Sequence, residues 1–239
     1  QWANMRPEQG GRKCDPSAAV VVHPVIGAVR MQVSDIIIAY VEMSYKSSIN
    51  QNVIYQEGDM RIIKLGVEPF EMISILKYDE VQQMNEHGSA RISGLIPYDK
   101  RDEYLKMAEK ETWVKILGYD EEEKETILFY GILTDFCIHT GGKSCVLDLT
   151  VYSGSRLMDC ERHTRSFQRD SHTYREVAGC CNAGYPEAGV IMTEGRDAQL
   201  PGFIMQYEET DWEFLKRLAG YLHTVLVPAS YVKGEKYFF

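Results

Sequence analysis

The chain has 239 residues, 44% of them hydrophobic, which is enough for one large β-rich unit or, as we expect here, two modest domains. Its formal net charge of −9 argues against specific or sequence-independent binding to nucleic acid, which requires a cationic surface. The longest apolar run, residues 18–29, contains His23 and Pro24 and is far shorter than the roughly 20 residues that span a bilayer, so no membrane insertion is expected.

Residues 1–31 mix glycine and proline with few apolar side chains and predict neither a helix nor a strand. We interpret them as an N-terminal arm, a strand lent to a neighbour, or a non-native leader ahead of Met31. The six cysteines form no paired framework, so reduced thiols are expected. They are Cys14, Cys137, Cys145, Cys160, Cys180 and Cys181.

Short β-branched runs separated by turn residues follow from residue 35 onward and predict strands. These runs cover residues 35–43, 53–55, 62–65, 70–78 and 90–96. In the run 70–78, Leu76 and Tyr78 fall on one face and Ile73 and Ile75 on the other. Residues 99–110 predict a helix whose apolar side carries Tyr104, Leu105, Met107 and Ala108.

Two hairpins are predicted next. Strands at 113–119 and 126–136 flank an acidic tip at 120–125, and strands at 136–139 and 145–152 flank a glycine pair. The tip lacks the spaced oxygen ligands and central glycine of a calcium loop, so a solvated turn is favoured. Many short strands in this order predict a small antiparallel barrel.

Two capping boxes mark helices in the last third of the chain. Thr173 and Glu176 open one helix, whose apolar face carries Tyr174, Val177, Ala178 and Cys181. Thr210 and Glu213 open the other, with an apolar stripe of Trp212, Leu215, Leu218, Ala219 and Leu222. A β-branched strand at 224–227, stopped by Pro228, is predicted after it.

The second of these helices carries a motif. Its residues are Tyr207, Glu209, Thr210, Asp211, Phe214, Leu215, Arg217 and Leu218. The pattern resembles the Tyr-x-Glu-(Ser/Thr)-Asp-x-x-Phe-Leu-x-Arg-Leu signature of the phage baseplate-hub, late control D and VgrG spike superfamily. The segments 157–159, 165–168 and 173–174 resemble a Leu-Leu-Asp, Arg-Ser-Phe-Gln and Thr-Tyr series in hub proteins of Gram-positive phages and phage-like particles, in the same order. Residues 129–133 and 147–155 are similar, less specifically, to the first barrel of that family.

The resemblance implies a β-rich α+β chain with antiparallel β-barrel domains of the tail-hub type and a few short capped helices. It implies a first tube domain at 32–155, then connector helices and a second, possibly incomplete, barrel at 156–239. The implied function is a structural, non-enzymatic hub, a homotrimer that joins the tail tube to the central spike. Such a protein assembles in the bacterial cytoplasm and then sits in the baseplate of a phage tail or injection particle. The family continues beyond this point, so the chain is read as a fragment or a short variant.

Two alternatives stay open. Cys160 and His163, or His172 with Cys180 and Cys181, have spacings that a zinc- or thiol-dependent hydrolase delivered by the particle could use, although no second ligand pair or nucleophile motif frames them. The other alternative is a monomeric ligand-binding β-barrel. No catalytic, cofactor or metal residue is assigned.

Five arginines lie within twenty residues of this acidic chain. They are Arg156, Arg162, Arg165, Arg169 and Arg175. They are read either as an internally paired connector or as a subunit interface, for which Arg162, Arg165, Arg169 and Arg175 are the candidates, because guanidinium groups suit bidentate interface pairing.

Overall fold

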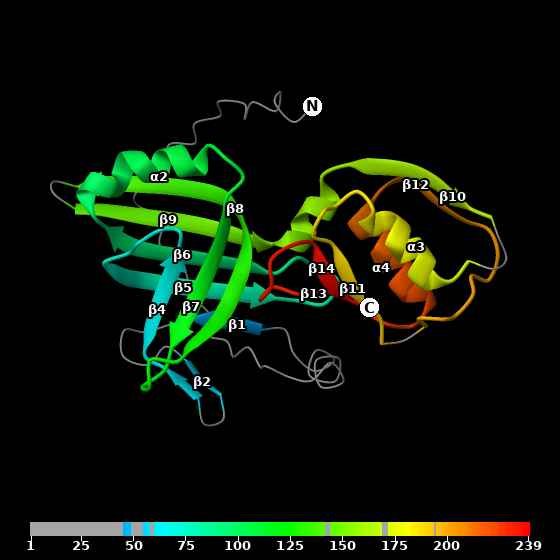
Figure 1. Ribbon diagram of the computed structural model, residues 1–239, viewed down its shortest axis with the longest axis horizontal. Coiled ribbons are helices and arrows are strands. Elements are labelled where there is room, and N and C mark those ends of the chain that lie inside the picture. The colour runs from blue at the N-terminus through cyan, green and yellow to red at the C-terminus, as the bar shows by residue number, and fades with distance from the viewer. Residues whose placement is uncertain (1–44, 49–54, 58–59, 142–143, 169–171, 194) are drawn as a thin grey trace.

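The computed structural model describes residues 45–48, 55–57, 60–141, 144–168, 172–193 and 195–239. Two hydrophobic cores follow one another along the long axis of the molecule (Figure 1). A large sheet encloses the first, and two α-helices with two small sheets enclose the second. The predicted N-terminal arm and the predicted strand at 35–43 lie outside the described residues.

The N-terminal part is an antiparallel sheet of seven strands in the order β1-β5-β6-β9-β8-β7-β4, curled like half of a barrel (Figure 1). Its strands are β1 (Tyr45–Ser48), β4 (Lys64–Glu68), β5 (Ser74–Gln82), β6 (Ser89–Ile96), β7 (Trp113–Tyr119), β8 (Glu125–Gly141) and β9 (Ser144–Ser153). A separate hairpin pairs β2 (Tyr55–Glu57) with β3 (Met60–Ile62). The 3-10 turn η2 (Tyr98–Lys100) and helix α2 (Arg101–Ala108) connect β6 to β7.

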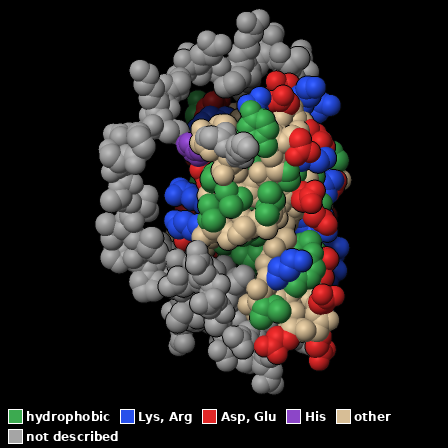
Figure 2. All heavy atoms as spheres, turned by 90° about the vertical axis from the view of Figure 1, so that its left-hand side faces the viewer, with side chains coloured by type: hydrophobic (Ala, Val, Ile, Leu, Met, Phe, Trp, Pro, Cys, Tyr) green, Lys and Arg blue, Asp and Glu red, His purple; other side chains and the backbone are tan. Residues whose placement is uncertain are grey.

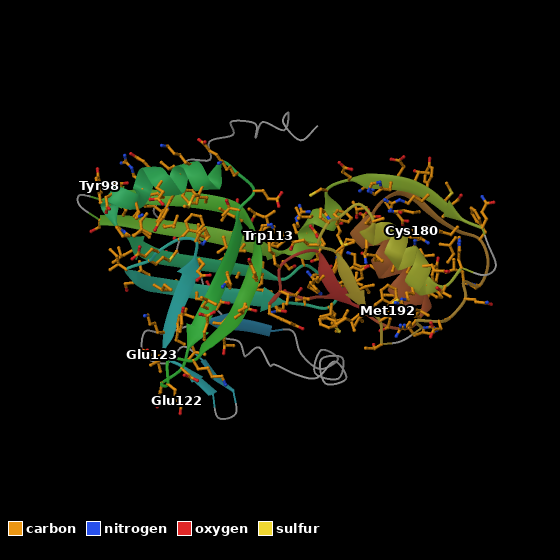
Figure 3. The ribbon with its side chains drawn as sticks, viewed as in Figure 1. Tyr98, Trp113, Glu122, Glu123, Cys180 and Met192 are labelled. Carbon is orange, nitrogen blue, oxygen red and sulfur yellow. The ribbon has the colours of Figure 1, made fainter. Side chains whose placement is uncertain are left out.

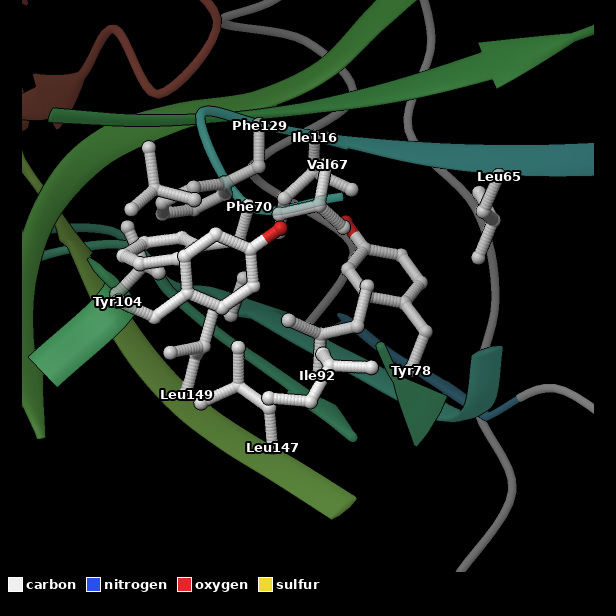
Figure 4. Packing of buried hydrophobic residues seen from close by; sticks show 14 of the residues in the cluster. Leu65, Val67, Phe70, Tyr78, Ile92, Tyr104, Ile116, Phe129, Leu147 and Leu149 are labelled. Carbon is white, nitrogen blue, oxygen red and sulfur yellow. The ribbon is translucent and has the colours of Figure 1, made fainter. Parts of the chain in front are cut away.

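The first core is built from strands whose side chains alternate between buried and partly exposed positions. In β9, Cys145, Leu147, Leu149 and Val151 are buried while the residues between them are partly exposed, because successive side chains of a strand point to opposite faces. Figure 4 shows the aromatic residues of this core gathered inside the curl. Helix α2 closes one side through Tyr104, which packs edge-on against Phe70 at 5.3 Å between ring centroids.

Several predicted elements of this part are confirmed. The strands predicted at 90–96 and 113–119 are β6 and β7, and the helix predicted at 99–110 is η2 followed by α2. Within α2, Tyr104 is buried and Met107 packs against the core, but Leu105 is exposed. The predicted position of Leu105 on the apolar side is therefore wrong, since the short helix buries little beyond Tyr104.

Two strand predictions need correction. The strand predicted at 70–78 begins only at Ser74, and a bulge between Ile75 and Lys77 shifts the alternation, so Leu76 is exposed while Tyr78 is buried. The strands predicted at 126–136 and 136–139 are one strand of 17 residues, β8. β8 pairs with β7 through its first half and with β9 through its second.

The C-terminal part begins where the sheet ends. Its elements are η3 (Gly154–Asp159), β10 (Arg162–Phe167), α3 (Tyr174–Asn182), β11 (Gly189–Ile191), β12 (Ile204–Thr210), α4 (Asp211–Tyr221), β13 (Val227–Pro228) and β14 (Lys236–Phe238). β10 and β12 form an antiparallel ribbon, and β14 lies between β11 and β13 in a three-stranded sheet.

Both capping boxes are confirmed. The Thr173 hydroxyl accepts from the Glu176 amide at 3.3 Å, and the Glu176 carboxylate accepts from the Thr173 amide at 2.8 Å. Thr210 and Glu213 do the same at 3.1 and 2.9 Å. These reciprocal bonds satisfy amides that the first turn of a helix leaves without partners.

The apolar faces predicted for the two helices are also confirmed. The predicted residues that are buried are Tyr174, Val177, Ala178 and Cys181 on α3, and Trp212, Leu215, Leu218 and Ala219 on α4, with Leu222 packed at the edge of the core. Phe214 on α4 is fully buried as well, although the predicted stripe did not include it. Within this core the rings of Phe167 and Phe214 stack at 5.8 Å.

The strand predicted at 224–227 is wrong for most of its length, because only Val227 and Pro228 form β13. The preceding residues close the end of α4 instead: His223 has a φ of 55° and the Thr224 amide donates to the Ala219 carbonyl at 3.0 Å. Strand β10 was not predicted, since its arginine-rich sequence lacks a hydrophobic alternation. Closed barrels remain a prediction for both parts of the chain. None of the helices in the described segments has the length and apolarity to cross a membrane.

Candidate functional site

The carboxylate of Asp211 is the centre of the C-terminal part. This first residue of α4 has a side chain only 1% exposed. It accepts hydrogen bonds from Arg165 on β10, from Gln206 Nε2 at 3.1 Å and from the Tyr185 hydroxyl at 3.1 Å. His163 Nε2 lies 3.3 Å away. One carboxylate thereby ties β10, β12 and the segment after α3 to the start of α4, where the helix dipole also favours a negative charge.

The ionisable groups around Asp211 respond to its charge. Burial raises the pKa of the Tyr185 phenol and of the Cys181 thiol, and the neighbouring Asp211 carboxylate raises both further. Burial tends to lower the pKa of Arg165, but the hydrogen bond and the charge of Asp211 raise it overall. The Tyr185 phenol and the Cys181 thiol therefore stay neutral and the Arg165 guanidinium stays charged. The buried Asp211 carboxylate thus gains a positive partner, and these two neighbours add no second negative charge.

A second carboxylate, Asp159 at the end of η3, joins the two parts of the chain. It accepts from His87 Nε2 at 2.9 Å and from the Thr210 hydroxyl at 2.5 Å. Burial alone would raise the pKa of Asp159, but the hydrogen bonds from His87 and Thr210 lower it overall. The Thr210 hydroxyl that caps α4 also donates to Asp159, and Asp159 accepts from His87 in the loop between β5 and β6. These hydrogen bonds connect α4 to the sheet.

The loop between β5 and β6 inserts into the C-terminal part. The Asn85 amide donates to the Leu226 carbonyl at 2.7 Å, and its side-chain oxygen accepts from the Leu226 amide at 2.9 Å. The Asn85 carbonyl accepts from Trp212 Nε1 at 3.2 Å, and the rings of His87 and Trp212 lie 4.6 Å apart. A side chain at Gly88 would approach the Ser230 hydroxyl to 2.3 Å. We call the residues Asn85, His87, Asp159, Thr210 and Trp212 the polar junction.

The motif residues have different roles: Thr210 belongs to the polar junction, and Phe214, Leu215 and Leu218 are buried in the second core. Glu209 binds Arg217 in a bidentate pair at 2.9 and 2.6 Å, and Arg217 also donates to the Met205 carbonyl at 2.6 Å, which fixes α4 against β12. Tyr207, in contrast, is 66% exposed. The motif therefore encodes a helix–strand joint with one aromatic side chain turned outward.

Of the four candidate interface arginines, the structure describes Arg162 and Arg165, both on β10, and Arg175 on α3. Arg165 forms an ion pair with Asp211, as expected if the arginines pair within the chain. Arg162 is exposed, donates to the Glu208 carbonyl and lies 3.5 Å from the Glu213 carboxylate. Arg175 is exposed in the first turn of α3, and Arg169 lies outside the described residues. The interface role of this set remains a prediction.

The candidate zinc and thiol residues are also spread out. Cys160 is exposed, while His163 turns to Asp211. On α3, Cys180 is exposed (Figure 3) and Cys181 is buried, on different sides of the helix as expected. Within the described ranges, no three histidine, cysteine, aspartate or glutamate side chains gather to hold a metal ion.

Sequence reasoning missed two arrangements. One is the role of Asp211, which is visible in the sequence only as one letter of a motif. The other lies on the outer face of the sheet, where His139 Nε2 is 3.4 Å from Cys137 Sγ and 3.0 Å from the Asp148 carboxylate. Both partners share one ring nitrogen on an open strand surface, so this group lacks the geometry of a catalytic triad, in which the acid and the nucleophile use different nitrogens.

Comparison with solved structures finds similar folds. The 43 kDa tail protein of prophage MuSo2 from Shewanella oneidensis has a TM-score of 0.50 and 13% identity, covering 73% of this chain and 51% of that one. The tail protein from Neisseria meningitidis MC58 has a TM-score of 0.50 and 15% identity, covering 73% of this chain and 49% of the other. A type VI secretion component, the E. coli c3393 protein, has a TM-score of 0.47 and 11% identity over 73% of this chain and 48% of its own.

The sequence matches no protein-family model and no curated protein. The chain spans about half the length of the solved structures that it resembles. At such low identity the likeness concerns the fold, and it agrees with the β-rich, tail-type fold expected from the sequence.

Proposed function

We propose that this chain is a structural subunit of the baseplate hub of a phage tail or phage-like contractile injection particle. The observation that carries the proposal is the fold, which is similar over 73% of the chain to two solved tail proteins, one of them from a prophage. The hub motif supports it, because Glu209 and Arg217 bind each other across the joint between β12 and α4, and Thr210 caps the helix there.

In this proposal, residues 32–155 and 156–239 are two tube-type domains, and three copies of the chain form a ring between the hexameric tail tube and the central spike. The subunit assembles in the bacterial cytoplasm and then becomes part of the particle. In this role the subunit is structural and not catalytic. The polar junction keeps the two cores in one orientation, so that each subunit presents the same surface to its neighbours. An acidic ring would repel passing DNA and leave its passage open.

The test is the mass of the purified chain in solution, measured by light scattering, together with negative-stain images. The expected result is a three-subunit ring with a central opening. A monomer at all concentrations would contradict the proposal. Stoichiometric metal or a hyper-reactive cysteine would favour a delivered hydrolase.

A further inference from the structure

The connection from β13 to β14 folds back onto the N-terminal sheet. The Tyr130 amide of β8 donates to the Ser230 carbonyl at 2.6 Å, and a side chain at Gly154 would collide with the Gly234 carbonyl oxygen. In Figure 1, β13 and β14 lie between the sheet and the helices α3 and α4. We call residues 229–236 the C-terminal strap.

One ion pair and one aromatic contact hold the tip of the C-terminal strap. Lys233 Nζ lies 2.7 Å from the Glu187 carboxylate and 5.6 Å from the ring centroid of Trp113. Trp113 begins β7 and lies where the sheet meets the C-terminal part (Figure 3), and its Nε1 donates to Glu111 Oε1 at 3.1 Å. The strap therefore connects β7 of the first core with the loop before β11.

Glu235 is the buried acid of the C-terminal strap. It is 4% exposed, and within the part of the chain that the structure describes its Oε2 atom has no hydrogen-bond partner. On the face shown in Figure 2, acidic side chains lie at the surface, where water solvates their charge. A charge on Glu235 would instead be buried, and burying a charge without a partner is costly.

The charged groups around Glu235 favour its neutral form. In the described segments Glu235 forms no ion pair, because Lys236 Nζ donates to the Lys233 carbonyl at 2.6 Å and Lys233 pairs with Glu187. Burial raises the pKa of Glu235, and the charges of Glu187 and Glu111 raise it further. The hydrogen bond from its own amide and the charge of Lys236 lower the pKa only in part.

The sign of the pH dependence is set by this raised pKa. The ordinary value for Glu235 is 4.5, so its contribution to the stability of the strap is complete below that value and is lost as the pH rises through the folded-state pKa. The tyrosines of this region are Tyr130, on β8, and Tyr231, in the strap. Burial raises the pKa of the Tyr231 phenol, which therefore adds no charge in this pH range.

We propose that Glu235 is a proton-dependent latch: the C-terminal strap lies on the sheet while this side chain is neutral, and opens more often once it ionises. Ionisation places a buried charge beside the carboxylates of Glu187 and Glu111, and solvation of that charge requires the strap to open. Opening breaks the bond between Tyr130 and Ser230 and leaves the polar junction to hold the two cores together. The relative orientation of the cores thereby depends on pH.

Hydrogen exchange of single amides, measured on the full chain from about pH 4 to about pH 7.5, tests this latch. The Tyr130 amide, bound to Ser230, and the Ala229 amide, which donates to the Lys236 carbonyl at 2.9 Å, report opening of the strap. After correction for the intrinsic exchange rate, the protection of both amides should fall at least about threefold as the pH rises.

Two conservative variants make the test specific to Glu235. Glu235→Gln is neutral at every pH, so the protection of both amides should keep its value in acid. Glu111→Gln keeps an acceptor for Trp113 Nε1 but removes a like charge, so the fall in protection should move to lower pH. The matched control is Glu208→Gln, at an exposed position on β12, which should leave the profile unchanged.

Circular dichroism checks that each variant is folded. If the protection does not fall with pH in the unchanged chain, or falls equally in folded Glu235→Gln, the latch is overturned. Should Glu235→Gln not fold, Glu111→Gln decides: a profile identical to that of the unchanged chain overturns the latch, and a fall at lower pH supports it. The hub proposal is independent of these results, because the mass of the assembly tests it.

Discussion

The two parts of the molecule differ in which residues bind a buried carboxyl group: neighbours on the same strand in the N-terminal sheet, and residues from several distant segments in the C-terminal part. In the sheet, Glu80 is bonded by Tyr78 and Gln82 of its own strand, each at 2.5 Å. In the C-terminal part, Asp211 draws its partners from β10, β12 and the segment after α3. The first core therefore depends on apolar packing with local polar pairs, whereas the second depends on one long-range ionic cluster.

The largest effect is expected from Asp211→Ala. Removing one partner of a buried charge pair leaves Arg165 uncompensated and costs about 3–5 kcal/mol of unfolding free energy. Urea unfolding measures the loss, and hydrogen exchange should show α4 and β10 exposed before β9. The control is Glu208→Ala at an exposed position, with a change within about 0.5 kcal/mol. Equal effects of Asp211→Ala and Glu208→Ala would mean that the cluster around Asp211 does not stabilise the C-terminal part, and the proposed difference from the first core would be wrong.

Leu147→Ala tests the other side of the comparison. Leu147 is fully buried in the first core, and such a truncation costs about 2–5 kcal/mol through lost burial and the cavity that remains. Hydrogen exchange should now rise in β6, β8 and β9 first. If α4 instead opens first, the two parts do not differ in their local stability in the way proposed.

The two helix caps allow a second comparison, in which the expected losses of unfolding free energy are smaller. Thr173→Ala removes a surface cap and should cost about 1 kcal/mol. Thr210→Ala removes the same kind of cap together with the hydrogen bond to Asp159, so it should cost about 2 kcal/mol. Thermal unfolding of both variants measures the difference. Equal losses would mean that the bond to Asp159 contributes nothing to stability.

The smallest effects are the pH dependences, which should have opposite signs for Glu80 in the sheet and Asp159 at the polar junction. Burial raises the pKa of Glu80 above its ordinary value of 4.5, so its contribution is complete below that value and is lost as the pH rises through the folded-state pKa. The pKa of Asp159 lies below its ordinary value of 3.8, so its contribution is present above that value and is lost as the pH falls through the folded-state pKa.

Unfolding free energies measured from about pH 3 to pH 7 check this expectation. The stability of Glu80→Gln relative to the unchanged chain should increase with pH. The stability deficit of Asp159→Asn should shrink as the pH falls. Profiles parallel to that of the unchanged chain would contradict both assignments.

The elements that the sequence predicts well are those whose signals are local. The capping boxes at Thr173 and Thr210 and the strand predicted at 145–152 each depend on residues within a few positions of one another, and the structure has them where they are expected. The motif resemblance likewise predicted a tail-type fold that the solved structures share.

The rest depends on contacts between distant residues, which no local pattern encodes. One bulge in β5 places Leu76 at the surface, and β10 forms its hydrogen bonds with β12, which is distant in the sequence. Asp211 and Asp159 meet their partners from as far away as His87, 72 residues earlier in the chain. A sequence pattern could suggest that Arg165 pairs internally, but not with which carboxylate.

Strand β8 has a mechanical consequence. Its 17 residues extend over about 57 Å at the usual rise per residue, and they bind β7 along one stretch and β9 along the next. A pull along this strand would load both ladders in shear at once, so the N-terminal sheet should resist tension as a single piece and rupture in one step, without peeling strand by strand.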